Sequence, residues 1–187
     1  IDVLETYDVD SERYSFLNIV CGGTAFQVVA LVRVGGGTPS SQRCLDKLIT
    51  YWISWAGWPR VLVCDRGLHN RGAMRIALRL NGVEQKFGAL EAPEEIGRAE
   101  RRGDIFKKGL RKVVNVHSVR GKKQMKLAAT QVQLTGNDTM KRGGIPSSMW
   151  VLGKHPRIPG QQTEEDELGK LGALESTLHA DTVFGLK

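Results

Sequence analysis

Residues 61–67, with the sequence VLVCDRG, place an aspartate directly behind four consecutive apolar residues. A short, fully apolar run is typical of a strand that is buried in the centre of a sheet. Asp65 lies at the carboxyl end of this run, where α/β folds expose their chemistry. A second acid, Glu100, follows in segment 98–126, where eleven Lys or Arg residues accompany only Glu100 and Asp104. The sequence therefore combines a strand-end carboxylate with a carboxylate in a strongly basic segment.

The segments around this run alternate between strand and helix patterns. Three strands, residues 1–4, 14–21 and 25–34, are separated by short polar or glycine turns, which predicts an antiparallel meander. Helices are predicted from Ser40 or Ser41 to Gly57, over 71–80, from Glu94 or Glu95 to Lys112 and over 121–135, with a last strand at 83–87. Trp52 and Trp55 fall on the apolar face of the first helix and are predicted to pack in the core. This order predicts an α/β fold with a mixed sheet.

A third carboxylate near the N-terminus completes a candidate metal site with Asp65 and Glu100. Asp2 lies in the predicted first strand, whereas Asp8 and Asp10 lie in a polar turn, where aspartate usually serves turn geometry. Asp2 is therefore favoured, with Asp8 as the main alternative. Three converging acids would repel one another without a cation. The carboxylate oxygens of these acids are hard ligands of the kind that Mg²⁺ prefers.

The charge of the chain is unevenly distributed. The net charge is +7, yet residues 163–187 hold six acidic and two basic residues, which leaves +11 on the first 162 residues. A positive surface of this kind supplies sequence-independent affinity for nucleic acid phosphates. The uninterrupted apolar runs are all shorter than a membrane-spanning helix requires. Cys21, Cys44 and Cys64 form no Cys-x-x-Cys motif and are predicted to be reduced thiols in apolar surroundings.

Three motifs give the chain a family resemblance: Cys64-Asp65-Arg66-Gly67, Gly97-Arg98-Ala99-Glu100-Arg101, and the segment from Gly143 to Arg157 with its Gly-Ile-Pro-Ser and Pro-Arg elements. From about Asp2 to Gly160 the chain resembles the catalytic core of retroviral and LTR-retrotransposon integrases, especially those of gypsy-type elements. Residues 91–97 depart from the pattern that usually precedes the glutamate. The resemblance implies a ribonuclease H-like fold, with a mixed five-stranded sheet and helices on both faces.

The same resemblance implies a metal-dependent polynucleotidyl transferase that processes DNA 3′ ends and joins them to target DNA. Asp2 would bridge two Mg²⁺ or Mn²⁺ ions, with Asp65 on one and Glu100 on the other. The residues expected to contact DNA are Arg101, Lys107, Lys108, Arg111, Lys112 and His69. The implied partners are element ends and target DNA, in a homodimer or higher oligomer located in the nucleus. Another ribonuclease H-like nuclease and a catalytically inactive DNA-binding descendant are the alternatives.

The sequence predicts a core domain over residues 1–160 and an acidic tail over residues 161–187. Leu168, Leu171, Leu174 and Leu178 follow helical spacing in the tail, which is compatible with an amphipathic helix. Such a helix is expected to pack on the core or a partner and to screen the basic surface. The alternative is a disordered linker. The chain begins with Ile rather than Met and is interpreted as an excised domain.

Overall fold

The computed structural model describes residues 1–67, 70–88 and 93–154. The chain divides into two compact units, residues 1–137 and residues 138–187. Each unit is described by itself. His69 and the acidic tail lie outside the described residues.

The first unit begins with three antiparallel strands, β1 (Asp2–Tyr7), β2 (Arg13–Val20) and β3 (Gln27–Val34), in the order β1-β2-β3. Asp2 pairs with Asn18 at the start of β1, and a β-bulge shifts the β2–β3 register between Ser15 and Phe16. The predicted meander is confirmed. β1 extends beyond the predicted residues 1–4 as far as Tyr7, where the polar turn begins.

The first helical segment contains a wider turn that its sequence pattern did not indicate. It consists of α1 (Ser41–Leu48), the π-helical turn η1 (Ile49–Ile53) and α2 (Ser54–Ala56). Ser40 is the N-cap, because its side chain accepts a hydrogen bond from the Arg43 backbone N–H. A π turn holds more residues per turn and so changes the direction of the side chains that follow. Trp55, which was predicted to be in the core, is 48% exposed.

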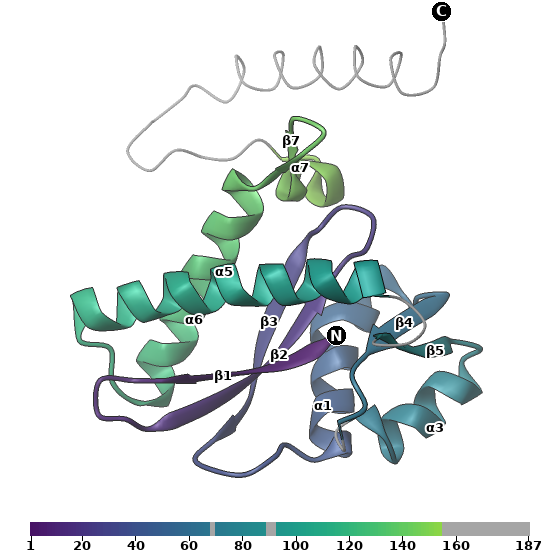
Figure 1. The fold of residues 1–187 in the computed structure, drawn as a ribbon, viewed down its shortest axis with the longest axis horizontal. Coiled ribbons are helices and arrows are strands. Elements are labelled where there is room, and N and C mark those ends of the chain that lie inside the picture. Colours follow the sequence, from purple (N-terminus) through teal and green to yellow (C-terminus); the bar gives the residue numbers. More distant parts are fainter. Residues whose placement is uncertain (68–69, 89–92, 155–187) are drawn as a thin grey trace, which may run out of the picture. The chain divides into compact units, whose positions relative to one another are not determined.

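A parallel pair of strands follows, β4 (Val61–Cys64) and β5 (Glu84–Phe87), with α3 (Ala73–Leu80) between them in the chain. The Ile1 nitrogen donates to the Val63 carbonyl oxygen at 2.6 Å, so the start of β1 lies beside β4. Figure 1 shows the N-terminus at this position. The described strands nevertheless form separate hydrogen-bonded sheets, and the predicted single five-stranded sheet is not confirmed.

Two long helices cover the three-stranded sheet, α5 (Pro93–His117) and α6 (Gly121–Thr139), and α5 crosses the strands in Figure 1. Both continue beyond their predicted ends. Val114 is buried in the core, which explains why α5 continues past Lys112. The main core cluster joins the sheet to both helices through Leu4, Tyr14, Phe16, Phe106, Leu110, Val114, Val119, Met125, Ala128 and Ala129.

Two glycines allow close packing of α5. A Cβ on Gly103 would lie 2.9 Å from Leu4 Cδ2, and one on Gly109 would lie 2.9 Å from Val132 Cγ1. Both distances are too short for ordinary contact, so glycine lets α5 approach β1 on one side and α6 on the other.

In the second unit, β6 (Lys141–Arg142) and β7 (Ile145–Pro146) form a small hairpin followed by α7 (Ser147–Leu152). Gly143 and Gly144 turn the hairpin with φ values of 59° and 87°. The Trp150 indole N–H donates to the Arg142 carbonyl oxygen at 3.3 Å. The third family motif, residues 143–157, therefore contributes to a hairpin and a helix as far as residue 154, while its Pro-Arg element lies outside the described residues. No helix in the described ranges is long and apolar enough to cross a membrane.

Candidate functional site

Asp2 lies on the face of the sheet that α5 covers. Side chains alternate between faces along a strand, so Asp2 shares a face with Leu4. Leu4 is buried and lies directly below Gly103 of α5. One carboxylate oxygen of Asp2 accepts the Val3 backbone N–H at 2.7 Å. The strand thus places this acid beneath the helix that carries Glu100.

Asp65 follows the last residue of β4 and is exposed. Its Oδ1 accepts hydrogen bonds from the Gly67 backbone N–H at 3.2 Å and from Asn70 Nδ2 at 2.6 Å. Asn70 is fully buried, and it also donates to the Asp65 carbonyl oxygen at 3.3 Å. The sequence did not identify Asn70, although a polar residue five positions after the strand-end acid is a signal that could have found it. Asn70 holds the Asp65 side chain in a defined orientation.

Asp2 and Asp65 come together at the junction of β1 and β4. Burial lowers the pKa of the Ile1 amino group, and the nearby Asp2 and Asp65 carboxylates act in the opposite direction. Ile1 is adjacent to Asp2 and Val63 precedes Asp65 by two residues, so the hydrogen bond between Ile1 and Val63 places the two acids in the same region.

Glu100 is exposed on α5, one residue after the point where the helix bonds to the sheet. Asn18 Nδ2 donates to the Ala99 carbonyl oxygen at 3.4 Å. Asn18 is also the strand partner of Asp2. The turn of α5 that carries Glu100 therefore lies over the part of the sheet that carries Asp2.

The donor set of Asp2, Asp65 and Glu100 has the hard-oxygen chemistry that Mg²⁺ and Mn²⁺ select. Among residues 1–67, 70–88 and 93–154, no group of three His, Cys, Asp or Glu side chains lies close enough to hold a metal ion. The donor chemistry therefore fits a divalent ion, and the fold brings the acids to one region without closing them into a ligand cluster.

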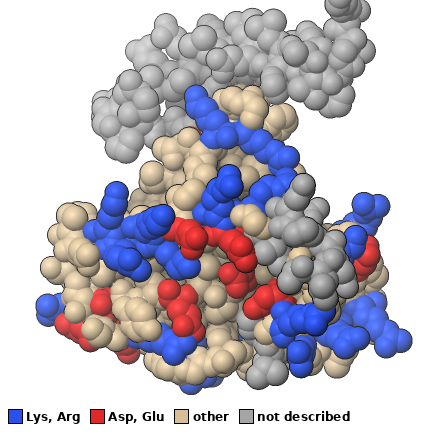
Figure 2. Space-filling view, in the orientation of Figure 1, with Lys and Arg blue, Asp and Glu red and all other residues tan. Residues whose placement is uncertain are grey.

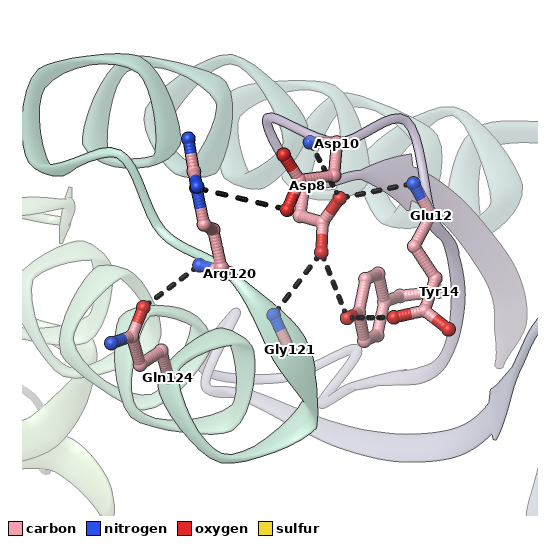
Figure 3. Close-up of polar contacts among 7 residues, drawn as sticks. All are labelled: Asp8, Asp10, Glu12, Tyr14, Arg120, Gly121 and Gln124. Carbon is pink, nitrogen blue, oxygen red and sulfur yellow. Dashed lines mark hydrogen bonds and ion pairs between the residues drawn. The ribbon is translucent and has the colours of Figure 1, made fainter.

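Asp8, the alternative first acid, is occupied by local contacts (Figure 3). Oδ1 accepts the backbone N–H groups of Asp10 and Glu12, each at 3.0 Å. Oδ2 accepts the Tyr14 hydroxyl at 3.0 Å and the Gly121 backbone N–H at 3.2 Å. Burial raises the pKa of Asp8, but these hydrogen bonds outweigh it and hold the pKa below its ordinary value. The Asp8 carboxylate thus ties the β1–β2 turn to the start of α6.

The predicted DNA-contacting side chains on α5 differ in exposure. Arg101, Lys108, Arg111 and Lys112 are exposed, whereas Lys107 is half-buried and forms an ion pair with Asp104 at 2.8 Å. The Lys107 ammonium lowers the pKa of the Asp104 carboxyl. Lys107 and Arg111 also line a groove of about 220 Å³ between α5 and the end of β1. Figure 2 shows basic side chains on this face around a smaller acidic group.

No protein-family model matches the sequence, and no curated protein matches it. Solved structures do match. The HTLV-2 integrase catalytic core domain, solved in complex with magnesium in a trimeric form, is 16% identical with a TM-score of 0.60, and the match covers 78% of this chain and 90% of that one. The catalytic core domain of BIV integrase is 13% identical with a TM-score of 0.57, and the match covers 81% of this chain and 92% of that one.

A chain of the simian T-cell lymphotropic virus intasome, solved in complex with PP2A regulatory subunit B56 gamma, is 16% identical with a TM-score of 0.63. That match covers 88% of this chain and 57% of the viral one. At these identities the likeness is one of fold. The chain has the ribonuclease H-like fold of retroviral integrase catalytic cores.

Proposed function

We propose that this protein is the core of a retrotransposon integrase, a metal-dependent polynucleotidyl transferase that processes DNA 3′ ends and joins them to target DNA. The observation that carries the proposal is the junction of β1, β4 and α5. There the Ile1 nitrogen bonds to the Val63 carbonyl oxygen, which places Asp2 beside the end of β4 that precedes Asp65. The side chain of Asn18, the strand partner of Asp2, bonds to the turn before Glu100. An integrase-core fold with acids at this junction supports phosphodiester chemistry.

In the proposed reaction, Asp2, Asp65 and Glu100 would hold the metal, and Asn70 keeps the Asp65 side chain in a fixed orientation. Two bound Mg²⁺ or Mn²⁺ ions would supply activation of the attacking oxygen and stabilisation of the leaving oxygen. In the first step water attacks a phosphodiester, the P–O3′ bond breaks, and a 3′-hydroxyl is released. In the second step that hydroxyl attacks a phosphodiester of target DNA and loses its proton, the P–O3′ bond of the target strand breaks, and the departing 3′-oxygen takes up a proton. The exposed Lys and Arg side chains on α5 bind the phosphates of the DNA backbone.

The proposed partners are element ends and target DNA, bound by a homodimer or higher oligomer in the nucleus. The neighbouring structures include dimeric and trimeric forms of the HTLV-2 core and an intasome, and these assemblies support the proposal. The basic surface of α5 supports a polyanionic partner.

A second candidate function follows from one specific observation. The described residues contain no group of three potential ligands placed close enough to hold a metal ion. This favours a descendant that binds DNA without cutting it. Another ribonuclease H-like nuclease remains the third candidate, and it would cleave DNA without joining the ends.

Strand cleavage and strand transfer on labelled DNA duplexes separate these candidates. The proposal expects 3′-end cleavage and joining in Mg²⁺ or Mn²⁺, and neither in EDTA. Cleavage without joining would favour a nuclease. Binding without cleavage in either metal would favour the inactive descendant and contradict the proposal.

The salt dependence of DNA binding tests the location of the binding surface. Replacing Lys107, Lys108, Arg111 and Lys112 together by Gln is expected to weaken binding to every sequence. The slope of log K against log salt is expected to flatten by roughly 0.9 for each phosphate that the variant no longer neutralises. Lys107 is expected to contribute least, because Asp104 already neutralises it.

The control removes the same charge elsewhere on the first unit, by replacing Arg43, Lys47, Arg75 and Arg79 on α1 and α3 by Gln. Fluorescence anisotropy over a series of salt concentrations measures both variants. An unchanged slope in the α5 variant, or an equal change in the control, would place the binding surface away from α5.

A further inference from the structure

Two buried amide side chains lie beneath the start of α5. Asn18 of β2 is 0% exposed, between Leu17 at 0% and Ile19 at 3%, and Gln27 at the start of β3 is 2% exposed. A buried amide costs free energy unless its hydrogen bonds are made. Apolar side chains would fill these core positions without that requirement, so the bonds that the amides form are informative.

The two amides bond to each other and to the backbone of α5. Gln27 Nε2 donates to Asn18 Oδ1 at 2.7 Å and to the Arg102 carbonyl oxygen at 3.4 Å. Asn18 Nδ2 donates to the Ala99 carbonyl oxygen at 3.4 Å. Ala99 and Arg102 lie on either side of Glu100 in the sequence. The amide pair therefore bonds to the turn of α5 that carries the third acid.

The other end of this network is anchored in α6. The Gln27 backbone N–H donates to Asn137 Oδ1 at 2.9 Å, and Asn137 Nδ2 donates to the Gln27 carbonyl oxygen at 2.8 Å. Arg102 is 4% exposed, and its Nη2 donates to the same Asn137 Oδ1 at 2.7 Å. Although Arg102 belongs to the basic segment, its guanidinium points into the protein and binds α6.

The network also reaches the first acid. Asn18 pairs with Asp2 across β1 and β2, so one amide lies beside Asp2 in the sheet and below Glu100 on the helix. A Cβ on Gly103 would lie 3.4 Å from Asn18 Nδ2, which shows how closely the helix approaches at this point. Asn18 thus lies beside Asp2 in the sheet and bonds to the helix turn that carries Glu100.

We propose that Asn18 and Gln27 are positioning residues that set the height and rotation of the Glu100 turn above Asp2. They act through the carbonyl groups of Ala99 and Arg102 rather than by contact with DNA or metal. The inference rests on the proposed function, because it concerns the same three acids. An apolar pair would keep the core filled and would lose the bonds that fix the turn.

The test replaces each amide by an apolar side chain and measures Mn²⁺ binding. Gln27→Met removes the donor at nearly constant volume, and Asn18→Ala removes the amide without adding bulk. The matched control is Gln133→Met, since Gln133 Oε1 accepts the Val29 N–H at 2.7 Å and joins β3 to α6 without reaching α5. Free Mn²⁺ is measured by its electron paramagnetic resonance signal in the presence of a short DNA duplex. The Mn²⁺ that the duplex binds by itself is subtracted.

Both variants are expected to weaken Mn²⁺ binding by about 10–100-fold, the range typical when groups that orient metal ligands are removed. The control is expected to bind as the wild type does. Hydrogen exchange should accelerate at the backbone amides of residues 99–103 in the two variants and remain unchanged there in the control. Thermal unfolding of the two variants and the control confirms that each protein is folded under the conditions of the binding measurement.

The outcomes separate the two proposals. Wild-type affinity in both variants would overturn the positioning role alone. Failure of both variants to fold would also overturn it, because the amides would then support the whole fold. If the wild-type protein binds Mn²⁺ but cuts no DNA, the proposed function is overturned. The Mn²⁺ affinities of the two variants then decide the positioning role. A wild type that binds no Mn²⁺ would overturn both.

Discussion

Replacing any one of the three acids, by Asp2→Asn, Asp65→Asn or Glu100→Gln, is expected to lower metal-dependent strand cleavage at least about 100-fold. Metal stabilisation of a phosphoryl transition state is worth several kcal/mol. Each 1.36 kcal/mol of barrier corresponds to about tenfold in rate. Cleavage of a labelled duplex in Mn²⁺ under single-turnover conditions measures the effect. Glu100 and Asp65 are exposed, so their amide variants are expected to fold normally.

Glu84→Gln is the matched control, because Glu84 is an exposed strand carboxylate whose ion pair with Lys86 spans 3.6 Å. It is expected to retain wild-type cleavage. Undiminished cleavage in Asp65→Asn or Glu100→Gln would refute the assignment of the site. If only Asp2→Asn cleaved as fast as the wild type, the assignment of Asp65 and Glu100 would stand. The identity of the first acid would then have to be decided again.

The second large effect is on stability. Asp8→Ala is expected to lower the free energy of unfolding by about 3 kcal/mol at pH 7, since it removes hydrogen bonds to a buried charged group. The folded pKa of Asp8 is below its ordinary value of 3.8, so its contribution is fully present above that value and is lost as the pH falls through the folded pKa. The difference between variant and wild type is therefore expected to shrink below pH 4. Urea unfolding at pH 7, 5 and 3 measures it.

Asp10→Ala in the same turn is the control. Asp10 is exposed and its ion pair with Arg120 spans 3.7 Å, so its loss is expected to change stability by less than about 1 kcal/mol. At temperatures where Asp8→Ala is folded, its cleavage rate is expected to match the wild type. A folded but inactive Asp8→Ala, beside an active Asp2→Asn, would make Asp8 the first acid.

Local patterns in the sequence were sufficient for most of the fold. The apolar run at residues 61–64 predicted β4 with its observed bounds, and Ser40 was correctly identified as an N-cap candidate. The π turn at Ile49–Ile53 was missed, because its residues also satisfy ordinary helical spacing. Helix ends were predicted too early where tertiary packing continues the helix, as at Val114.

The candidate site was only partly visible in the sequence. Asp2, Asp65 and Glu100 were selected by motif and position, and their role stays a prediction. The residues that orient them, Asn70 and Asn18, bond to partners that are set by strand register and helix packing. No spacing rule reveals that Asn18 lies beneath Ala99, because the two are joined only in the folded sheet and helix.

The glycines of α5 have a consequence for the order in which structure forms. Glycine inside a helix costs about 1 kcal/mol relative to Ala, so Gly103 and Gly109 weaken α5 as an independent helix. Their contacts with Leu4 and Val132 are available only once the sheet and α6 are in place. We therefore expect the helix that carries Glu100 to draw much of its stability from its contacts with β1 and α6. A partly folded chain is expected not to hold Asp2, Asp65 and Glu100 in one region, so the proposed cleavage of DNA would require the completed domain.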